Sequence, residues 1–176
     1  MHPIFELVDG DDAAGIRELL ARDPETAAAR DESGVSPLAR ALYRGKTDAF
    51  EALRGSAPLD DPWDRLLAGK ADGLPAPDAW SPDGFTGLHL AAFAHNPAAA
   101  RVLLAAGADP NVLARASFAR VTPLGTCAFA NEPEVARLLL QHGADPSIAV
   151  DEESLPLAVA EANGYAEVAE MLRAAS

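Results

Sequence analysis

A pair of closely similar segments in the second half of the chain constrains its fold more than any other feature. Residues 97–110 and 133–146 lie 36 positions apart, and nine of their fourteen positions are identical. Both segments begin with proline, contain a Leu-Leu pair and end in Gly-Ala-Asp-Pro. A repeat period in this range is typical of stacked-repeat proteins. Because each unit of such a protein buries its apolar face only against its neighbours, we expect further copies on both sides of this pair.

A recurring helix-start signal extends the repeat over the whole chain. A proline, or once a glycine, precedes a bulky apolar residue at six places: Pro3-Ile4, Pro37-Leu38, Pro62-Trp63, Gly87-Leu88, Pro123-Leu124 and Pro156-Leu157. Proline suits the first turn of a helix, because its missing N–H has no partner there in any case. We therefore predict one domain over residues 1–176, built from six units with approximate bounds 2–34, 35–57, 58–80, 81–114, 115–150 and 151–176.

The end units and the third unit differ from the rest. Glu18 and Arg173 stand at positions that are apolar in the central units, so we expect the first and last units to act as caps whose outer faces meet water. The third unit is degenerate, because glycine and proline between residues 73 and 77 cut its second helix short. Gly107 and Gly143 follow the second helices of units four and five and are predicted to be left-handed helix caps.

Composition limits the partners that this chain can have. It carries 14 Lys and Arg against 27 Asp and Glu, a net charge of −13, which repels phosphate backbones and anionic lipid surfaces. We therefore expect neither nucleic acid nor membrane as a partner. No stretch approaches the length of an apolar spanning helix, and the N-terminus lacks a signal-peptide pattern. Since the single cysteine, Cys127, cannot form an internal disulfide, we expect a cytoplasmic protein. We also expect it to be a monomer.

Two motifs connect the repeat with a known family. Residues 86–92 read Thr-Gly-Leu-His-Leu-Ala-Ala, and residues 107–111 read Gly-Ala-Asp-Pro-Asn. The chain resembles the ankyrin repeat, whose pattern includes Thr-Pro-Leu-His and Gly-Ala-Asp in units of about 33 residues. Gly87 and Gly125 depart from this pattern, since they replace its proline and its histidine. His95 and Asn131 stand where the family prefers glycine between the helices.

The resemblance implies both a fold and a broad function. The fold would be all-α, an ankyrin-type α-solenoid of about five to six stacked helix-turn-helix units with loop or β-turn fingers and a degenerate third unit. We expect its curvature to be uneven near residues 57–80. The function would be that of a non-enzymatic interaction module that binds a protein or peptide on its concave face. Fold alone does not identify the partner.

Aromatic residues are the candidate contacts on that face. Alignment of the first helices places three of them in one column: Tyr43, Phe93 and Phe129. Three more fall at the tips of the predicted loops: Trp80, Phe85 and Phe118. Exposed aromatic rings are frequent at the energetic centres of interfaces, so we predict that both sets bind the partner. The alternative is that these rings fill gaps between alanine-rich helices.

Arginines are expected beside these rings. Arg40, Arg44, Arg115 and Arg120 are expected to lie beside the rings, and Arg44 and Arg120 are predicted to contact the partner. Against the acidic background, a local basic strip would suit an acidic segment of a partner. The alternative is that these are ordinary solvated surface arginines.

The sequence shows no pattern for catalysis, and we expect neither cofactor nor metal. There is no glycine-rich phosphate loop, nucleophile elbow or His-Glu metal motif. His89 matches the family histidine that bonds locally to its own loop, and Cys127 is expected to be a small buried residue. We therefore expect no enzymatic activity. The alternatives are a regulatory or inhibitor subunit of an enzyme, a self-associating structural protein, or a hydrolytic site around His89, His95 and Asp83.

Overall fold

The computed structural model describes residues 2–117, 119–148 and 154–176. These residues form eleven α-helices, one 3₁₀-helix and no β-strand, so the predicted all-α fold is confirmed. The elements are α1 (Pro3–Asp9), α2 (Ala13–Arg22), η1 (Pro24–Ala28), α3 (Pro37–Tyr43), α4 (Thr47–Ser56), α5 (Pro62–Leu67), α6 (Gly87–Phe93), α7 (Pro97–Ala105), α8 (Pro123–Ala130), α9 (Pro133–Gln141), α10 (Pro156–Ala162) and α11 (Ala166–Ala175).

Local chemistry at the helix starts explains why the helices begin where they do. Proline occupies the first turn of α1, α3, α5, α7, α8, α9 and α10, where its missing N–H costs nothing. The side chains of Ser36, Asn96 and Thr122 each accept a hydrogen bond of 3.0 Å from the N–H three residues on. Such caps satisfy backbone donors that the helix itself leaves without a partner.

One backbone turn closes the first helix of every unit. A residue with positive φ follows each of these helices: Asp11, Gly45, Gly69, His95, Asn131 and Gly164. The next N–H then donates to a carbonyl five positions back, as from Asn96 to Ala91 at 2.8 Å. Six such turns in series support the six predicted registers. His95 and Asn131 adopt the left-handed conformation of the glycine that the family prefers, at an expected cost of about 1 kcal/mol each.

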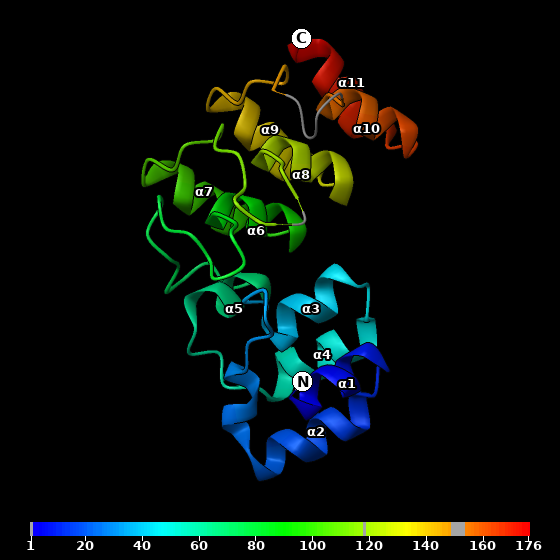
Figure 1. Cartoon of the computed structure of the whole chain (residues 1–176). Coiled ribbons are helices and arrows are strands. Elements are labelled where there is room, and N and C mark those ends of the chain that lie inside the picture. Colours follow the sequence, from blue (N-terminus) through cyan, green and yellow to red (C-terminus); the bar gives the residue numbers. More distant parts are fainter. Residues whose placement is uncertain (1, 118, 149–153) are drawn as a thin grey trace.

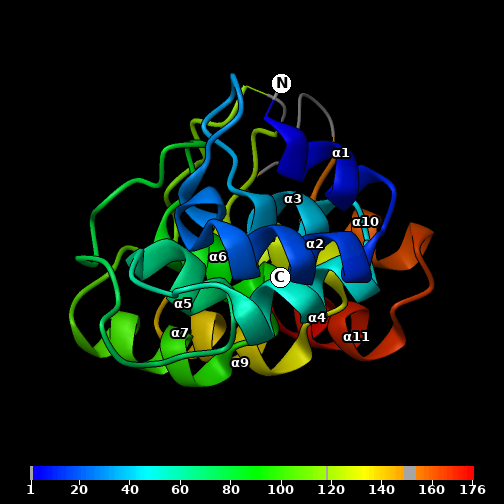
Figure 2. The ribbon, with the colours of Figure 1, turned by 90° about the horizontal axis from the view of Figure 1, so that it is seen from below.

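The helices pack in two layers around a thin core. The first helices of the units (α1, α3, α5, α6, α8 and α10) form one layer, and the second helices (α2, α4, α7, α9 and α11) form the other. The units stack from α1 and α2 to α10 and α11, so the terminal units lie at opposite ends (Figure 1). Viewed from below, the loop between η1 and α3 and the loop between α7 and α8 lie at the same edge of the stack (Figure 2). Small alanines such as Ala91 and Ala99, both fully buried, allow the two layers to approach closely.

The third unit is shorter than the sequence led us to expect. We predicted a truncated second helix, but residues 68–86 contain no helix at all, and this expectation was wrong. Pro75 and Pro77 lie in this segment, and proline removes the N–H donors that a helix requires. As a result α4 and α7 are not packed together, and the outer layer is interrupted between them. The inner layer stays continuous, because α5 contacts both α3 and α6.

The connection between α4 and α5 spans only residues 57–61, so the finger that would precede unit three is absent and its two neighbours meet. Gly34, in the finger that leads into unit two, lies so close to unit four that a Cβ atom there would be 2.6 Å from the Pro82 carbonyl oxygen. Gly84 approaches the next finger equally closely, at 2.6 Å from the Ala116 nitrogen. Unit two therefore contacts unit four directly on the finger side, across the space where a third finger would lie.

Charged side chains on the helices at the two ends of the stack are exposed. The side chains of Glu18 and Arg173 are 66% and 57% exposed on α2 and α11, the outermost helices of the stack. Gly107 and Gly143 have φ values of 92° and 84°, which confirms the predicted left-handed caps.

Candidate protein-binding surface

Phe129 is the most exposed of the predicted aromatic contacts that the structure describes. It lies in the last turn of α8 and is 48% exposed, although the other face of the same helix is buried, with Leu124 and Cys127 at 0%. Ala162 occupies the equivalent position of the next inner helix and is also exposed. An exposed aromatic ring is a frequent contact at the energetic centres of interfaces.

Tyr43, Phe85 and Phe93 do not form an open row. Their rings form a cluster in which Tyr43 lies 5.2 Å from Phe93 and 6.0 Å from Phe85, and Phe85 lies 5.7 Å from Phe93. Phe85 is 0% exposed, so the prediction that it lies at an exposed loop tip was wrong. The short third unit is the reason: it lets rings from units two and four meet and fill the space between them. Tyr43 and Phe93 remain half-buried.

A hydrogen bond fixes Tyr43 in this cluster. Its hydroxyl donates to Asp83 Oδ2 at 3.0 Å, while the Ser81 hydroxyl donates to Asp83 Oδ1 at 2.5 Å. Burial raises the pKa of Tyr43 well above its usual value, and the nearby carboxylates of Asp83 and Asp64 raise it further. The phenol therefore stays protonated and acts as a hydrogen-bond donor between units two and four.

The remaining loop-tip residues have different environments. Trp80 is half-buried, and the Arg115 guanidinium lies over its ring at 3.9 Å from the centroid, within the range of a cation–π contact. Arg120 is exposed. The prediction for Phe118 falls outside the described residues.

Two of the four arginines of the predicted basic strip, Arg40 and Arg44, are neutralised by carboxylates. Arg40 is 9% exposed and donates to Asp9 at 2.6 and 2.8 Å and to Asp31 at 3.0 Å. Arg44 is half-exposed and also bonds to Asp9, at 3.0 Å. The hydrogen bond from Arg40 is the main cause that lowers the Asp9 pKa. Asp9 lies at the end of α1, at the position that Tyr43 occupies in α3. Since Arg40 and Arg44 bond to this carboxylate of the neighbouring unit, they stabilise the contact between units one and two and do not form an open basic surface.

His89 has a structural environment. It is 0% exposed; its Nε2–H donates to the Val121 carbonyl at 2.8 Å, and its Nδ1 lies 3.3 Å from the Thr86 N–H. The carbonyl can only accept, which places the proton on Nε2 and leaves Nδ1 as an acceptor. Burial lowers the pKa of His89 to about 4, against a smaller opposing effect of the Val121 carbonyl. The imidazole is therefore neutral and joins the finger of unit four to the chain that enters unit five.

His95 and Glu132 join the turns of units four and five. His95 Nδ1 lies 2.5 Å from Glu132 Oε2. Hydrogen bonding to Glu132 raises the pKa of His95. Burial by itself pushes the pKa of Glu132 upward, but hydrogen bonds from His95 and Val135 outweigh it and lower the pKa overall. Each group of the pair therefore favours the charged form of the other.

These environments give no support to the hydrolytic alternative. His89 is closed to solvent, His95 is paired with Glu132, and Asp83 bonds to Tyr43 and Ser81. Burial raises the pKa of the Cys127 thiol, and Glu132 raises it further, so this side chain is not an activated nucleophile. The described residues contain no group of three or more His, Cys, Asp or Glu that could hold a metal ion. Nor do they contain a helix long and apolar enough to cross a membrane.

Sequence reasoning missed a buried polar link at the third unit. The Ser36 hydroxyl donates to Asp64 Oδ1 at 2.6 Å, and Arg30 lies 3.5 Å from Asp64 Oδ2. Burial raises the pKa of Asp64 to about 6, against the opposing effects of Ser36 and Arg30. Asp64 and Ser36 are 28 positions apart, and no local pattern in the sequence indicates that they meet.

Two comparisons with known proteins agree with this architecture. Residues 88–176, about half of the chain, match a family model described as ankyrin repeats in three copies. Neurogenic locus notch homolog protein 4 of Homo sapiens is 39% identical over 95 residues, which make up 53% of this chain. The match spans only 4% of the length of that relative.

Proposed function

Because this chain belongs to the ankyrin repeat family, we propose that it is a non-enzymatic module that binds a protein or peptide through the inner helix layer, centred on Phe129. The family indicates a protein–protein interaction module in general terms. The observation that supports this particular surface is the 48% exposure of Phe129, in a helix whose other residues are mostly buried. We also propose that the protein acts as a monomer in the cytoplasm, where the unpaired Cys127 would stay reduced.

The proposed mechanism is binding to a preformed surface. The turns, caps and buried alanines fix α6, α8 and α10 relative to one another, so few groups need to be ordered when a partner binds. Phe129 would supply the central apolar contact, with Ala162 leaving room for a partner side chain. Phe93 would lie at the edge, since it is half-buried and held by the Tyr43 cluster. Arg120 and Arg44 would belong to the polar surroundings, where single charges contribute little.

A matched pair of substitutions tests this proposal. Phe129→Glu places a charge on the proposed surface, whereas Val102→Glu places the same charge on α7 of the other layer, at a side chain with similar exposure of 47%. Both proteins should fold, since neither side chain is part of the core. We expect partners that co-purify with the wild-type protein to be lost from Phe129→Glu and retained by Val102→Glu. Equal recovery of these partners by both variants would show that Phe129 is not part of the binding surface.

A further inference from the structure

A stacked tryptophan–arginine pair joins the fingers of units four and five. Trp80 lies at the base of the unit-four finger, where it pairs with Thr86, and the Arg115 guanidinium lies 3.9 Å from the centroid of its ring. The Arg115 N–H donates to the Gly84 carbonyl at 2.8 Å, which fixes the backbone of the arginine to the same finger. Stacking on the half-buried ring holds the guanidinium plane in place, so this group loses little side-chain freedom when it binds a partner.

A second arginine lies at the base of the same finger of unit five. The Ala114 N–H donates to the Val121 carbonyl at 2.8 Å, and this bond closes the finger. Arg115 and Arg120 are the residues just inside this bond, one on each side, so their backbones lie next to each other. Both side chains are exposed. A single exposed arginine contributes little to binding, but two arginines of one finger can each add a charge-assisted hydrogen bond to the same anionic group.

Arg115 and Arg120 stand out in this acidic chain because their charges are not neutralised within the described residues. Most other arginines there form ion pairs with carboxylates. In the ranges that the structure describes, the guanidinium groups of Arg115 and Arg120 make neither an ion pair nor a hydrogen bond. A guanidinium presents its N–H donors in a planar fork that matches the two oxygens of a carboxylate. The two arginines therefore offer the donors that a carboxylate of another molecule would accept.

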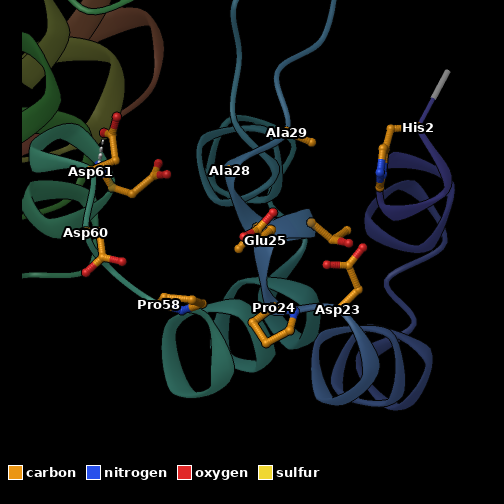
Figure 3. Close-up of a pocket in the computed structure, with 12 residues that line it drawn as sticks. His2, Asp23, Pro24, Glu25, Ala28, Ala29, Pro58, Asp60 and Asp61 are labelled. Carbon is orange, nitrogen blue, oxygen red and sulfur yellow. Dashed lines mark hydrogen bonds between the residues drawn. The ribbon is translucent and has the colours of Figure 1, made fainter.

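The net charge of −13 does not prevent an anionic group from binding at this finger. Figure 3 shows acidic side chains, among them Asp23 and Asp60, around the η1 segment, at the junction of units one to three. The Asp83 carboxylate lies in the same finger as Trp80, but its two oxygens already accept hydrogen bonds. At physiological ionic strength, salt largely screens exposed charges that lie more than about 8 Å away.

We propose that Arg115, held on the Trp80 ring, and Arg120 bind a carboxylate side chain in an acidic segment of the partner protein. This inference rests on the proposed function, because it names the chemistry of the partner that the module binds. Arg115 donates two parallel N–H groups to the carboxylate while its face stays on the indole ring. Arg120 supplies a further donor from the other side of the finger.

NMR titration with the peptide Gly-Glu-Gly-Glu-Gly tests this proposal, with Gly-Gln-Gly-Gln-Gly as the uncharged probe. The reporter is the indole N–H signal of Trp80, identified by its loss in Trp80→Phe. Arg115→Gln and Arg120→Gln each remove one charge from the finger. Arg101→Gln is the matched control, since Arg101 is an exposed arginine on α7 that makes no ion pair within the described residues. The same spectra report whether each variant is folded.

We expect the glutamate peptide to shift the Trp80 signal until it saturates, and the glutamine peptide to leave it in place. Arg115→Gln should weaken binding about fivefold and Arg120→Gln about threefold, whereas Arg101→Gln should change it by less than about twofold. Arg115→Lys keeps the charge but loses the planar fork, so it should still bind about threefold more weakly than the wild type. Equal losses in Arg101→Gln and Arg115→Gln would mean that only net charge matters and would overturn the proposal, as would equal shifts from the two peptides.

Two further outcomes separate this inference from its alternatives. If the glutamate peptide bound only after Asp151→Asn, Glu152→Gln and Glu153→Gln, an acidic segment of this chain would occupy the arginines, and the proposal would be wrong. If co-purifying partners were lost from Phe129→Glu but recovered equally by Arg115→Gln and the wild type, this inference would fail while the proposed function stood.

Discussion

Asp11 provides a sharp test of how neighbouring units hold each other in place. Helix α4 has Lys46 at its N-cap, and lysine supplies no capping acceptor. Asp11 of the preceding unit takes over this role, because its Oδ1 accepts a hydrogen bond of 2.8 Å from the Ala49 N–H in the first turn of α4. Asp11 itself has a φ of 55°, in the left-handed region. One side chain thus closes the turn of unit one and caps the second helix of unit two.

Three substitutions separate these two roles. Asp11→Ala removes the cap, at about 1 kcal/mol, and places alanine in the left-handed region, at about 1 kcal/mol more, so we expect a loss of about 2 kcal/mol. Asp11→Gly also removes the cap but accepts positive φ easily, so its loss should be about 1 kcal/mol. Asp11→Asn keeps an acceptor and tolerates this conformation, so it should lose less than about 0.5 kcal/mol.

Urea denaturation followed by circular dichroism measures these differences. The expected order of stability is wild type and Asp11→Asn highest, Asp11→Gly lower and Asp11→Ala lowest. If Asp11→Asn were as unstable as Asp11→Ala, the hydrogen bond to Ala49 would not be the stabilising contact. If Asp11→Gly and Asp11→Ala were equally stable, the backbone conformation of Asp11 would contribute nothing.

Three further predictions concern the junction at the third unit and the buried titrating groups. Tyr43→Phe leaves buried Asp83 without one donor and should cost about 1–2 kcal/mol, whereas Tyr165→Phe, whose hydroxyl bonds to no described residue, should change the thermal midpoint little. Gly34→Ala should destabilise more than Gly45→Ala, because both have positive φ but only the first brings Cβ against Pro82; equal effects would argue against direct contact between the fingers. Between pH 7 and 4.5, His89 lowers the free energy of unfolding by about 2.5 kcal/mol, because its pKa near 4 lies below the unfolded value, so that the unfolded chain is protonated first. Over the same interval Asp64 raises the free energy of unfolding by about 2 kcal/mol, because its pKa near 6 lies above the unfolded value and the folded chain is protonated first. The variant Asp64→Asn should therefore lose about 2 kcal/mol more than the wild type over this interval in urea titrations, and an equal loss would contradict the raised pKa of Asp64.

The fold was predictable because its signals are local. Proline at a helix start, a capping side chain such as Asn96, and glycine with positive φ at Gly107 act over a few residues, and they recur along the chain. The exposed end faces followed from Glu18 and Arg173, because charged residues there replace apolar ones. Repetition strengthened each weak signal, since the same pattern had to occur at matching positions in successive units.

The candidate surface was harder to predict because it depends on contacts between distant units. Phe85 would lie at a loop tip in a regular stack, but the finger between α4 and α5 is absent, and Phe85 packs against Tyr43 and Phe93. Arg40 and Arg44 are neutralised by Asp9, which lies in another unit. Alignment of the units gives the position of each residue in the repeat. It does not show which residues of units two and four come into contact when unit three is incomplete.

Photo-crosslinking from position 129 tests the central claim, that this protein binds a partner through its inner helix layer, most directly. A photoreactive phenylalanine analogue is placed at Phe129, and at Val102 as the control, in cells that express the protein. We predict a discrete crosslinked product from position 129, of the same mass in repeated experiments, and none from position 102. The same products from both positions, or none from position 129, would contradict the account.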